Sequence, residues 1–371
     1  MLSTYDAIRP FEAYELPDAY SRLESDPQFK TVVAYLYPQV PFEAIMRKMR
    51  GCTTCLEFQK TFCYPFLKEL MSKASKGFDI DVQAIDVSRR YTFVSNHRDI
   101  VLDSALLDVL LIDAGAETTT EIAIGDNLLA APWIKDLVRI NKSFIVERSL
   151  PPREMLAASK RLAEYMHLVV NEKHDNIWIA QREGRAKDSD DRTQPSILKM
   201  MAMGGEGSII DRLKQLHIVP LSISYEYDPC DFLKAREYQL KRDIPGWHKT
   251  KADDVESMRT GIMGYKGEVH YHCAPCIDDW LDTLPADMPR GELFETVAAH
   301  IDAEIHSHYR LYASNRVAAG AESTDEERQA FASYVDSQLA KIQLDAPDEP
   351  FLRERIVTMY ANPYYNHLHA L

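Results

Sequence analysis

Between residues 80 and 280, the chain alternates short apolar runs with longer segments that repeat apolar residues at helical intervals. The runs are rich in β-branched and aromatic residues, which favour strands. Strands that alternate with helices build parallel sheets covered by helices on both faces. The sequence therefore predicts an α/β fold with a mixed, largely parallel sheet flanked by helices. The expected strands are 90–96, 119–126, 142–148, 175–181, 217–225 and 267–273, and the expected helices are 104–115, 131–140, 151–171 and 195–216.

The two ends of the chain have a helical pattern instead. Residues 1–78 are rich in helix formers with apolar side chains three or four residues apart, and helical patterns return after Pro289. We therefore expect an N-terminal helical subdomain (1–78), an α/β domain (79–290) and a C-terminal helical extension (291–371) that packs on the α/β domain. The extension should hold helices over 291–317, 324–343 and 349–361.

One segment inside the α/β domain departs from the alternation. Residues 240–262 are charged and contain Pro245 and Gly246. Because this composition is typical of exposed connections, we expect an inserted excursion over the surface.

The composition narrows the function classes. The 371 residues carry 43 Lys+Arg against 57 Asp+Glu, a net charge of −14, which argues against general nucleic-acid binding because phosphate contacts need a positive surface. The first twenty residues do not resemble a signal peptide, and no apolar run is long enough for a membrane span. Six cysteines are few for this length and fit reduced thiols. We expect a cytoplasmic protein that contacts a membrane only peripherally, at its inner face.

A titratable cluster follows the first strand of the α/β domain, in the sequence "FVSNHRDIVLDS". Ligands of parallel sheets bind beyond the carboxyl ends of the strands, and His97 stands at such an end. A histidine held by a carboxylate, here Asp103 or Asp99, can act as a general base. The alternative is that Asp103 only caps the next helix and His97 is an ordinary loop residue.

Three further blocks follow this cluster in order. They are "NKSFIVERS" with Arg148, "IWIAQREGRAKD" with Glu183, Gly184 and Arg185, and "HIVPLSISYEY" around Pro220. Together the four blocks resemble the glycerolipid acyltransferases of the glycerol-3-phosphate and lysophosphatidate type, over about residues 80–280. The first block of that family is His-x4-Asp. Here Leu102 stands at the family's Asp position, while Asp103 lies one residue later and Asp99 three earlier. We favour Asp103, because "LDSALL" restores a capped helix directly after it.

The resemblance implies a glycerol-3-phosphate acyltransferase-like fold and acyl transfer from acyl-CoA or acyl carrier protein. The acceptor would be a hydroxyl of glycerol 3-phosphate or its monoacyl product, with His97 as the base, and no cofactor or metal. A different hydroxyl or amine acceptor stays open. The altered spacing also leaves open a lipid-binding protein that has the fold without the catalysis.

A phosphate on the acceptor needs cationic partners, and guanidinium groups suit it because they can bind two of its oxygens at once. The resemblance assigns this role to Arg148 and Arg185, with Lys142 and Arg98 as weaker local candidates. Glu183 and Gly184 would form a tight turn that binds substrate, because glycine permits close backbone approach.

The stretch "HYHCAPC" offers zinc-type ligands in His270, His272, Cys273 and Cys276. However, the two histidines alternate along an expected strand and no second half-site follows. We therefore predict no metal at this place.

Overall fold

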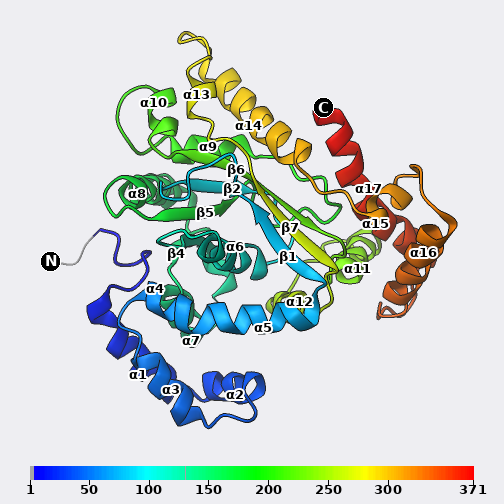
Figure 1. The fold of residues 1–371 in the computed structure, drawn as a ribbon, viewed down its shortest axis with the longest axis horizontal. Helices are drawn as coiled ribbons and strands as arrows, with labels where there is room; N and C mark the ends of the chain where they lie inside the picture. The colour runs from blue at the N-terminus through cyan, green and yellow to red at the C-terminus, as the bar shows by residue number, and fades with distance from the viewer. Residues whose placement is uncertain (1–3, 130) are drawn as a thin grey trace.

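The computed structural model describes residues 4–129 and 131–371 and contains a seven-stranded sheet in the order β1-β7-β6-β2-β5-β3-β4 (Figure 1). All neighbouring strands are parallel except β6 and β7, which are antiparallel. The predicted α/β class with a mixed, largely parallel sheet is therefore confirmed. The strands are β1 Gly77–Asp81, β2 Thr92–Ser95, β3 Thr120–Gly125, β4 Ser143–Val146, β5 Asn176–Ala180, β6 Ile218–Tyr225 and β7 Glu268–Cys273.

Helices cover both faces of this sheet. One face packs against α5 (Tyr64–Ala74) and α6 (Leu102–Asp113). The other packs against α8 (Pro152–Asn171), α9 (Pro195–Met201) and α14 (Arg290–Ser307). The four residues of β2 and the eight of β6 are buried throughout. Strands that are buried on both faces have nearly continuous apolar sequences, which explains why β2 and β6 could be predicted.

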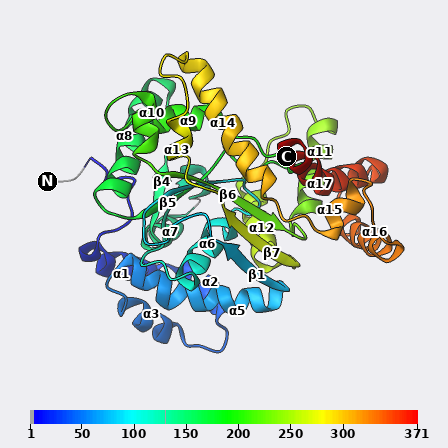
Figure 2. The same cartoon turned by 45° about the horizontal axis from the view of Figure 1, so that its top comes forward.

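The first helices form a small core of their own beside the sheet (Figure 2). They are η1 Ala13–Glu15, α1 Leu16–Ser25, α2 Pro27–Leu36, α3 Phe42–Arg50, α4 Cys55–Phe58 and η2 Gln59–Cys63. Their core is shared with α7 (Pro132–Ile140), through Ile140. The predicted helical content of this region is therefore present, while a subdomain bounded at residue 78 stays a prediction. The edge strand β1, which pairs with β7, was not predicted, because it is acidic and only half-buried.

In the middle of the chain, one predicted helix is divided and another helix was not predicted. The expected helix 195–216 is two helices, α9 and α10 (Ile209–Lys214), and between them Gly205 and Gly207 have positive φ values of 74° and 87°. The expected surface excursion at 240–262 contains the end of α11 (Asp231–Asp243) and a helix that was not predicted, α12 (Lys251–Met263). Most of residues 241–256 are exposed, as expected. Thr250 starts α12 with a capping box, since its hydroxyl accepts from the Asp253 backbone and its backbone donates to the Asp253 carboxylate.

The C-terminal part is helical, as predicted, with α13 (Asp278–Leu281) before α14 and then α15 (Ala313–Ala318), α16 (Asp325–Leu339) and α17 (Glu349–Ala370). The expected helix 291–317 is, however, two helices, α14 and α15, with residues 308–312 between them. Helices α15, α16 and α17 form a cluster on α11, at the right of Figure 1. The buried Asp231 at the start of α11 accepts hydrogen bonds from Tyr334 (2.6 Å) and Tyr360 (2.8 Å). The exact division into three parts stays a prediction.

Among the described residues, no helix combines the length and the apolar character that crossing a membrane requires.

Candidate active site

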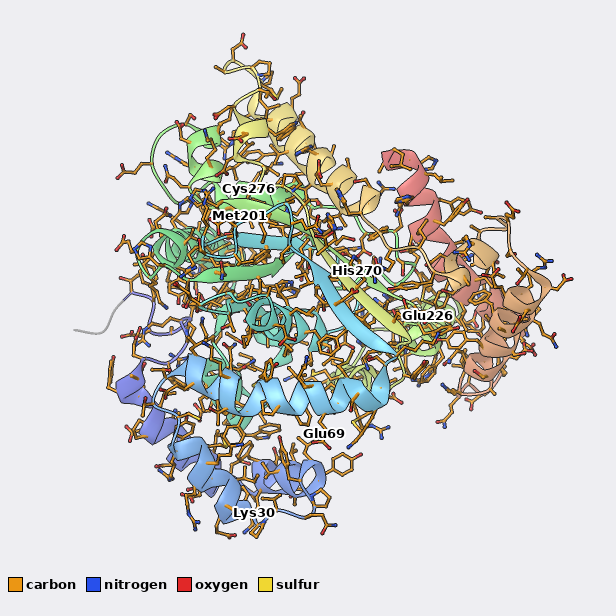
Figure 3. All side chains as sticks on the ribbon, in the orientation of Figure 1. Lys30, Glu69, Met201, Glu226, His270 and Cys276 are labelled. Atoms are coloured by element: carbon orange, nitrogen blue, oxygen red, sulfur yellow. The ribbon has the colours of Figure 1, made fainter. Side chains whose placement is uncertain are left out.

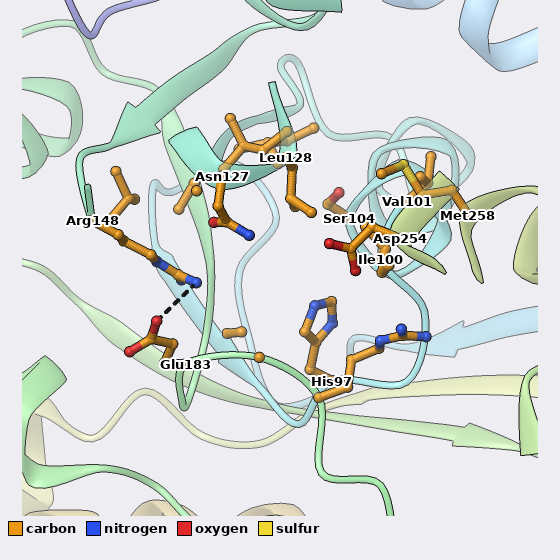
Figure 4. A pocket seen from close by; sticks show the side chains of 18 of the residues that line it. His97, Ile100, Val101, Ser104, Asn127, Leu128, Arg148, Glu183, Asp254 and Met258 are labelled. Atoms are coloured by element: carbon orange, nitrogen blue, oxygen red, sulfur yellow. Dashed lines mark ion pairs between the residues drawn. The ribbon is translucent and has the colours of Figure 1, made fainter. Parts of the chain in front are cut away.

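The carboxyl ends of β2, β3, β4 and β5 meet at one edge of the sheet, where a cavity of about 930 Å³ opens. His97 follows β2, Asn127 lies on the short helix η3 (Asp126–Leu128) after β3, Arg148 follows β4 and Glu183 follows β5. Figure 4 shows these four side chains around one space. Loops that are far apart in the sequence therefore meet at a single site.

His97 is held by a carboxylate at the centre of its own turn. The ring Nδ1 lies 2.8 Å from Oδ2 of Asp103, which is fully buried. The same oxygen accepts the backbone N–H groups of Arg98 (2.6 Å) and Asp99 (3.0 Å), and Oδ1 accepts the hydroxyl of Tyr225 (3.3 Å). Because the carboxylate only accepts, Nδ1 carries the proton of a neutral ring, and Nε2 is left as the proton acceptor.

The Asp99 carboxylate has a different position. Its Oδ1 accepts the backbone N–H groups of Val101 (2.9 Å) and Leu102 (2.8 Å), so it caps α6. Burial raises the pKa of Asp99, and the charge of Asp103 raises it further. In the structure, the His97 ring therefore pairs with Asp103 and not with Asp99.

The ring of Trp178, on β5, lies edge-on to His97 with centroids 5.6 Å apart. Sequence reasoning did not select Trp178 or Tyr225, although both lie on predicted strands close to their carboxyl ends. Strand position is the signal that could have found them, because side chains near the ends of neighbouring parallel strands gather at one edge.

The two arginines of the predicted phosphate site both line the cavity. Arg148 lies 3.6 Å from Glu183 across the cavity mouth, the contact marked in Figure 4. Gly184 has a φ of 68°, which favours glycine, and it turns the chain so that Arg185 points inward. The Nη1 atom of Arg185 is buried and has no hydrogen-bond partner within residues 4–129 and 131–371. A buried guanidinium with a free donor is suited to an anionic ligand.

Lys142 and Arg98 do not line this cavity, which corrects their prediction as substrate-binding residues. Lys142 precedes β4, at the opposite edge of the sheet, and pairs with Asp175 at 2.8 Å. Arg98 points behind the His97 turn, where its buried guanidinium lies 2.9 Å from the carboxylate of Asp191. Both cations are therefore used for structural ion pairs.

The rest of the cavity wall is largely apolar and comes from elements that sequence analysis did not connect with the site. Trp133 and Leu137 of α7 line one part, and Leu162 of α8 and Met200 of α9 line another. The helix α12 adds a third wall, with Asp254 and Met258 in view in Figure 4. Local sequence gives no signal for these contacts, because they depend on how distant helices pack.

The four zinc-type side chains of the "HYHCAPC" stretch do not come together. His270 pairs with Asp79, and His272 stacks on His308 with ring centroids 4.0 Å apart. Figure 3 shows His270 along β7 and Cys276 well separated from it. The positions of these four residues therefore rule out a zinc site formed by all of them.

His97, Arg148 and Arg185 lie within a segment that matches a known family model. Residues 79–224 match the family model described as Acyltransferase. Among solved structures, the 1-acyl-sn-glycerophosphate (LPA) acyltransferase PlsC from Thermotoga maritima matches with 14% sequence identity and a TM-score of 0.39, over 78% of this chain and 92% of that chain. No curated protein matches.

Proposed function

We propose that the protein transfers a fatty acyl group from an acyl thioester to a hydroxyl of glycerol 3-phosphate or 1-acylglycerol 3-phosphate. The match of residues 79–224 to the family model described as Acyltransferase supports this proposal. The observation that carries the proposal is the buried His97–Asp103 pair, 2.8 Å apart, beside a cavity with apolar walls and guanidinium groups. The donor would be acyl-CoA or acyl carrier protein.

In the proposed reaction, Nε2 of His97 accepts the proton of the acceptor hydroxyl as that oxygen bonds to the thioester carbonyl carbon. Asp103 keeps the ring in the required tautomer and stabilises the imidazolium that forms. The tetrahedral intermediate then breaks its C–S bond, and the imidazolium returns the proton to the leaving thiolate. An ester and a free thiol result, without a covalent enzyme intermediate.

The guanidinium groups of Arg148 and Arg185 would hold the acceptor phosphate while its hydroxyl faces His97. The free Nη1 donor of Arg185 supports this role. Glu183 already pairs with Arg148, so we propose that it keeps this guanidinium extended across the cavity mouth. The apolar walls would receive the acyl chain.

The test measures thiol release from an acyl-CoA with a panel of acceptors that includes glycerol 3-phosphate and 1-acylglycerol 3-phosphate. We expect His97→Ala to lower kcat on the order of 100-fold or more, because a general base is lost. The matched control is His369→Ala, an exposed histidine near the C-terminus, which should leave the rate unchanged. Full activity in His97→Ala would refute the mechanism.

A second arm of the same assay addresses the phosphate. Arg185→Gln should raise the KM for the phosphate acceptor and leave the KM for the thioester nearly unchanged. Arg153→Gln, whose side chain is 85% exposed on α8, is the control. If the panel instead selects an acceptor without phosphate, Arg185→Gln should have no acceptor-specific effect.

The alternative is a lipid-binding protein without catalysis. The reason for this alternative is the changed spacing between His97 and the carboxylate. The contact between His97 and Asp103 weakens this reason. Binding of acyl-CoA without thiol release, for every acceptor, would favour it. A cytoplasmic location with peripheral membrane contact stays a prediction.

A further inference from the structure

Three metal-ligand side chains meet at the edge of the sheet opposite to His97. His217 directly precedes β6, and Cys276 and Asp278 follow β7. Their ligand atoms all lie within 4.8 Å of one another, and within the described parts of the chain no other group of three or more His, Cys, Asp or Glu has this arrangement. We propose that these residues form a binding site for a divalent cation of the zinc type, independent of the acyltransferase site.

The backbone fixes the two segments that carry these ligands. The N–H of Ile277, which lies between Cys276 and Asp278, donates to the carbonyl of Ile218 at 3.0 Å, and Ile218 follows His217. His217 has a φ of 46°, a left-handed conformation that is uncommon for a residue other than glycine. The backbone therefore holds the two ligand-carrying segments side by side before any cation binds.

One carboxylate oxygen of the cluster, Oδ1 of Asp278, lacks a hydrogen bond of standard geometry within the described residues. This oxygen is buried, and the Cys276 thiol lies beside the same carboxylate. The other oxygen lies 2.6 Å from Nδ1 of His217. A buried oxygen without a regular hydrogen bond costs free energy, and a cation between the three side chains would satisfy it.

The donor set selects the class of cation. An imidazole nitrogen, a sulfur and a carboxylate oxygen together suit zinc, whereas magnesium and calcium prefer oxygen ligands alone. Zinc bonds of about 2.0–2.3 Å place tetrahedral ligand atoms roughly 3.3–3.7 Å apart. The distance between Nδ1 of His217 and Oδ2 of Asp278, now 2.6 Å, would have to lengthen by about 1 Å when the cation replaces the proton between these atoms. Binding releases the thiol proton of Cys276, and water completes the fourth position.

The test titrates the full-length, metal-free protein with Co²⁺, a spectroscopic substitute for Zn²⁺ whose thiolate bond gives a charge-transfer absorption band. We expect one Co²⁺ per chain with this band and with the visible bands of tetrahedral geometry, both abolished by competing Zn²⁺. Cys276→Ser should remove the charge-transfer band, while Cys63→Ser, at a thiol outside the cluster, should retain it.

His217→Gln and Asp278→Asn each keep the side chain's approximate size and should weaken binding by roughly tenfold or more, because each removes a ligand. Circular dichroism of each variant verifies that it is folded. A charge-transfer band that survives in Cys276→Ser, or equal Co²⁺ affinity in all variants, would overturn the proposal. Absence of any stoichiometric Co²⁺ binding would do the same and would leave His217 and Asp278 as a plain ion pair. None of these outcomes depends on thiol release from acyl-CoA, so the acyltransferase proposal is tested separately.

Discussion

The single carboxylate of Asp103 binds a side chain and two backbone groups at once. Its Oδ2 contacts Nδ1 of His97 and the N–H groups of Arg98 and Asp99. The chain between His97 and Asp103 therefore curls around this oxygen. A spacing one residue longer than the family pattern still gives contact, because a turn, unlike a helix, has no fixed periodicity.

This geometry predicts different effects for two isosteric substitutions. Asp103→Asn should lower kcat on the order of 100-fold or more, because the amide can stabilise the wrong tautomer of His97 and cannot balance the imidazolium charge. Asp99→Asn should lower it far less, because an asparagine oxygen can also cap α6.

The measurement is thiol release at several pH values with saturating acyl-CoA, together with the melting temperature of each variant. Equal loss in both variants, at equal stability, would show that the ring does not depend on Asp103 alone.

At the scale of elements, α12 forms a cavity wall because it approaches the His97 turn closely. Gly261 of α12 packs against the Asp99 carboxylate, and a Cβ atom at this position would overlap Oδ2. The end of α12 is held by the buried Lys266, whose ammonium donates to the carbonyls of Ile262 (3.1 Å) and Gly264 (2.6 Å). These contacts hold the C-terminal part of α12 against the His97 turn, while most of residues 241–256 are exposed.

We expect Gly261→Ala to force α12 away from Asp99 and to destabilise the fold by about 1–3 kcal/mol, the usual cost of overpacking. The KM for the thioester should also rise, because the wall moves. Gly291→Ala is the matched control, since a Cβ at that helical position meets no atom within 4 Å. It should be neutral or slightly stabilising.

Urea unfolding and thiol-release kinetics of the two variants provide the comparison. A Gly261→Ala protein with unchanged stability and KM would mean that α12 is not held against the turn in solution.

At the scale of the whole molecule, a buried acid links the α/β part to the C-terminal helices. Asp231 of α11 accepts the hydroxyl groups of Tyr334 on α16 and Tyr360 on α17. Burial raises the pKa of Asp231 from 3.8 to about 7. Folded chains therefore retain a proton that unfolded chains release between about pH 4 and pH 7. The stabilisation by this group is full below that range and is lost as the pH rises through it.

Asp231→Asn removes this titration while leaving an oxygen that the tyrosines can bond. We expect the stability of the natural protein, relative to Asp231→Asn, to fall as the pH rises from about 4 to about 7 and then to level off. Urea unfolding at a series of pH values measures the difference. The exposed Asp345→Asn is the control, and it should give a curve parallel to that of the natural protein. Parallel curves for Asp231→Asn as well would refute the linkage.

The sequence by itself determined most of the strands and the edge of the sheet at which the candidate site lies. Six of the seven strands and the place of His97, Arg148 and Arg185 at strand ends follow from local periodicity and from the rule that parallel strands gather their carboxyl ends. Tertiary structure alone decided which carboxylate holds the ring, that Lys142 and Arg98 face Asp175 and Asp191, and that α12 closes the cavity. The physical reason is that periodicity fixes which face of an element is buried. The direction of a polar side chain in a turn depends instead on the charge that another part of the chain places beside it.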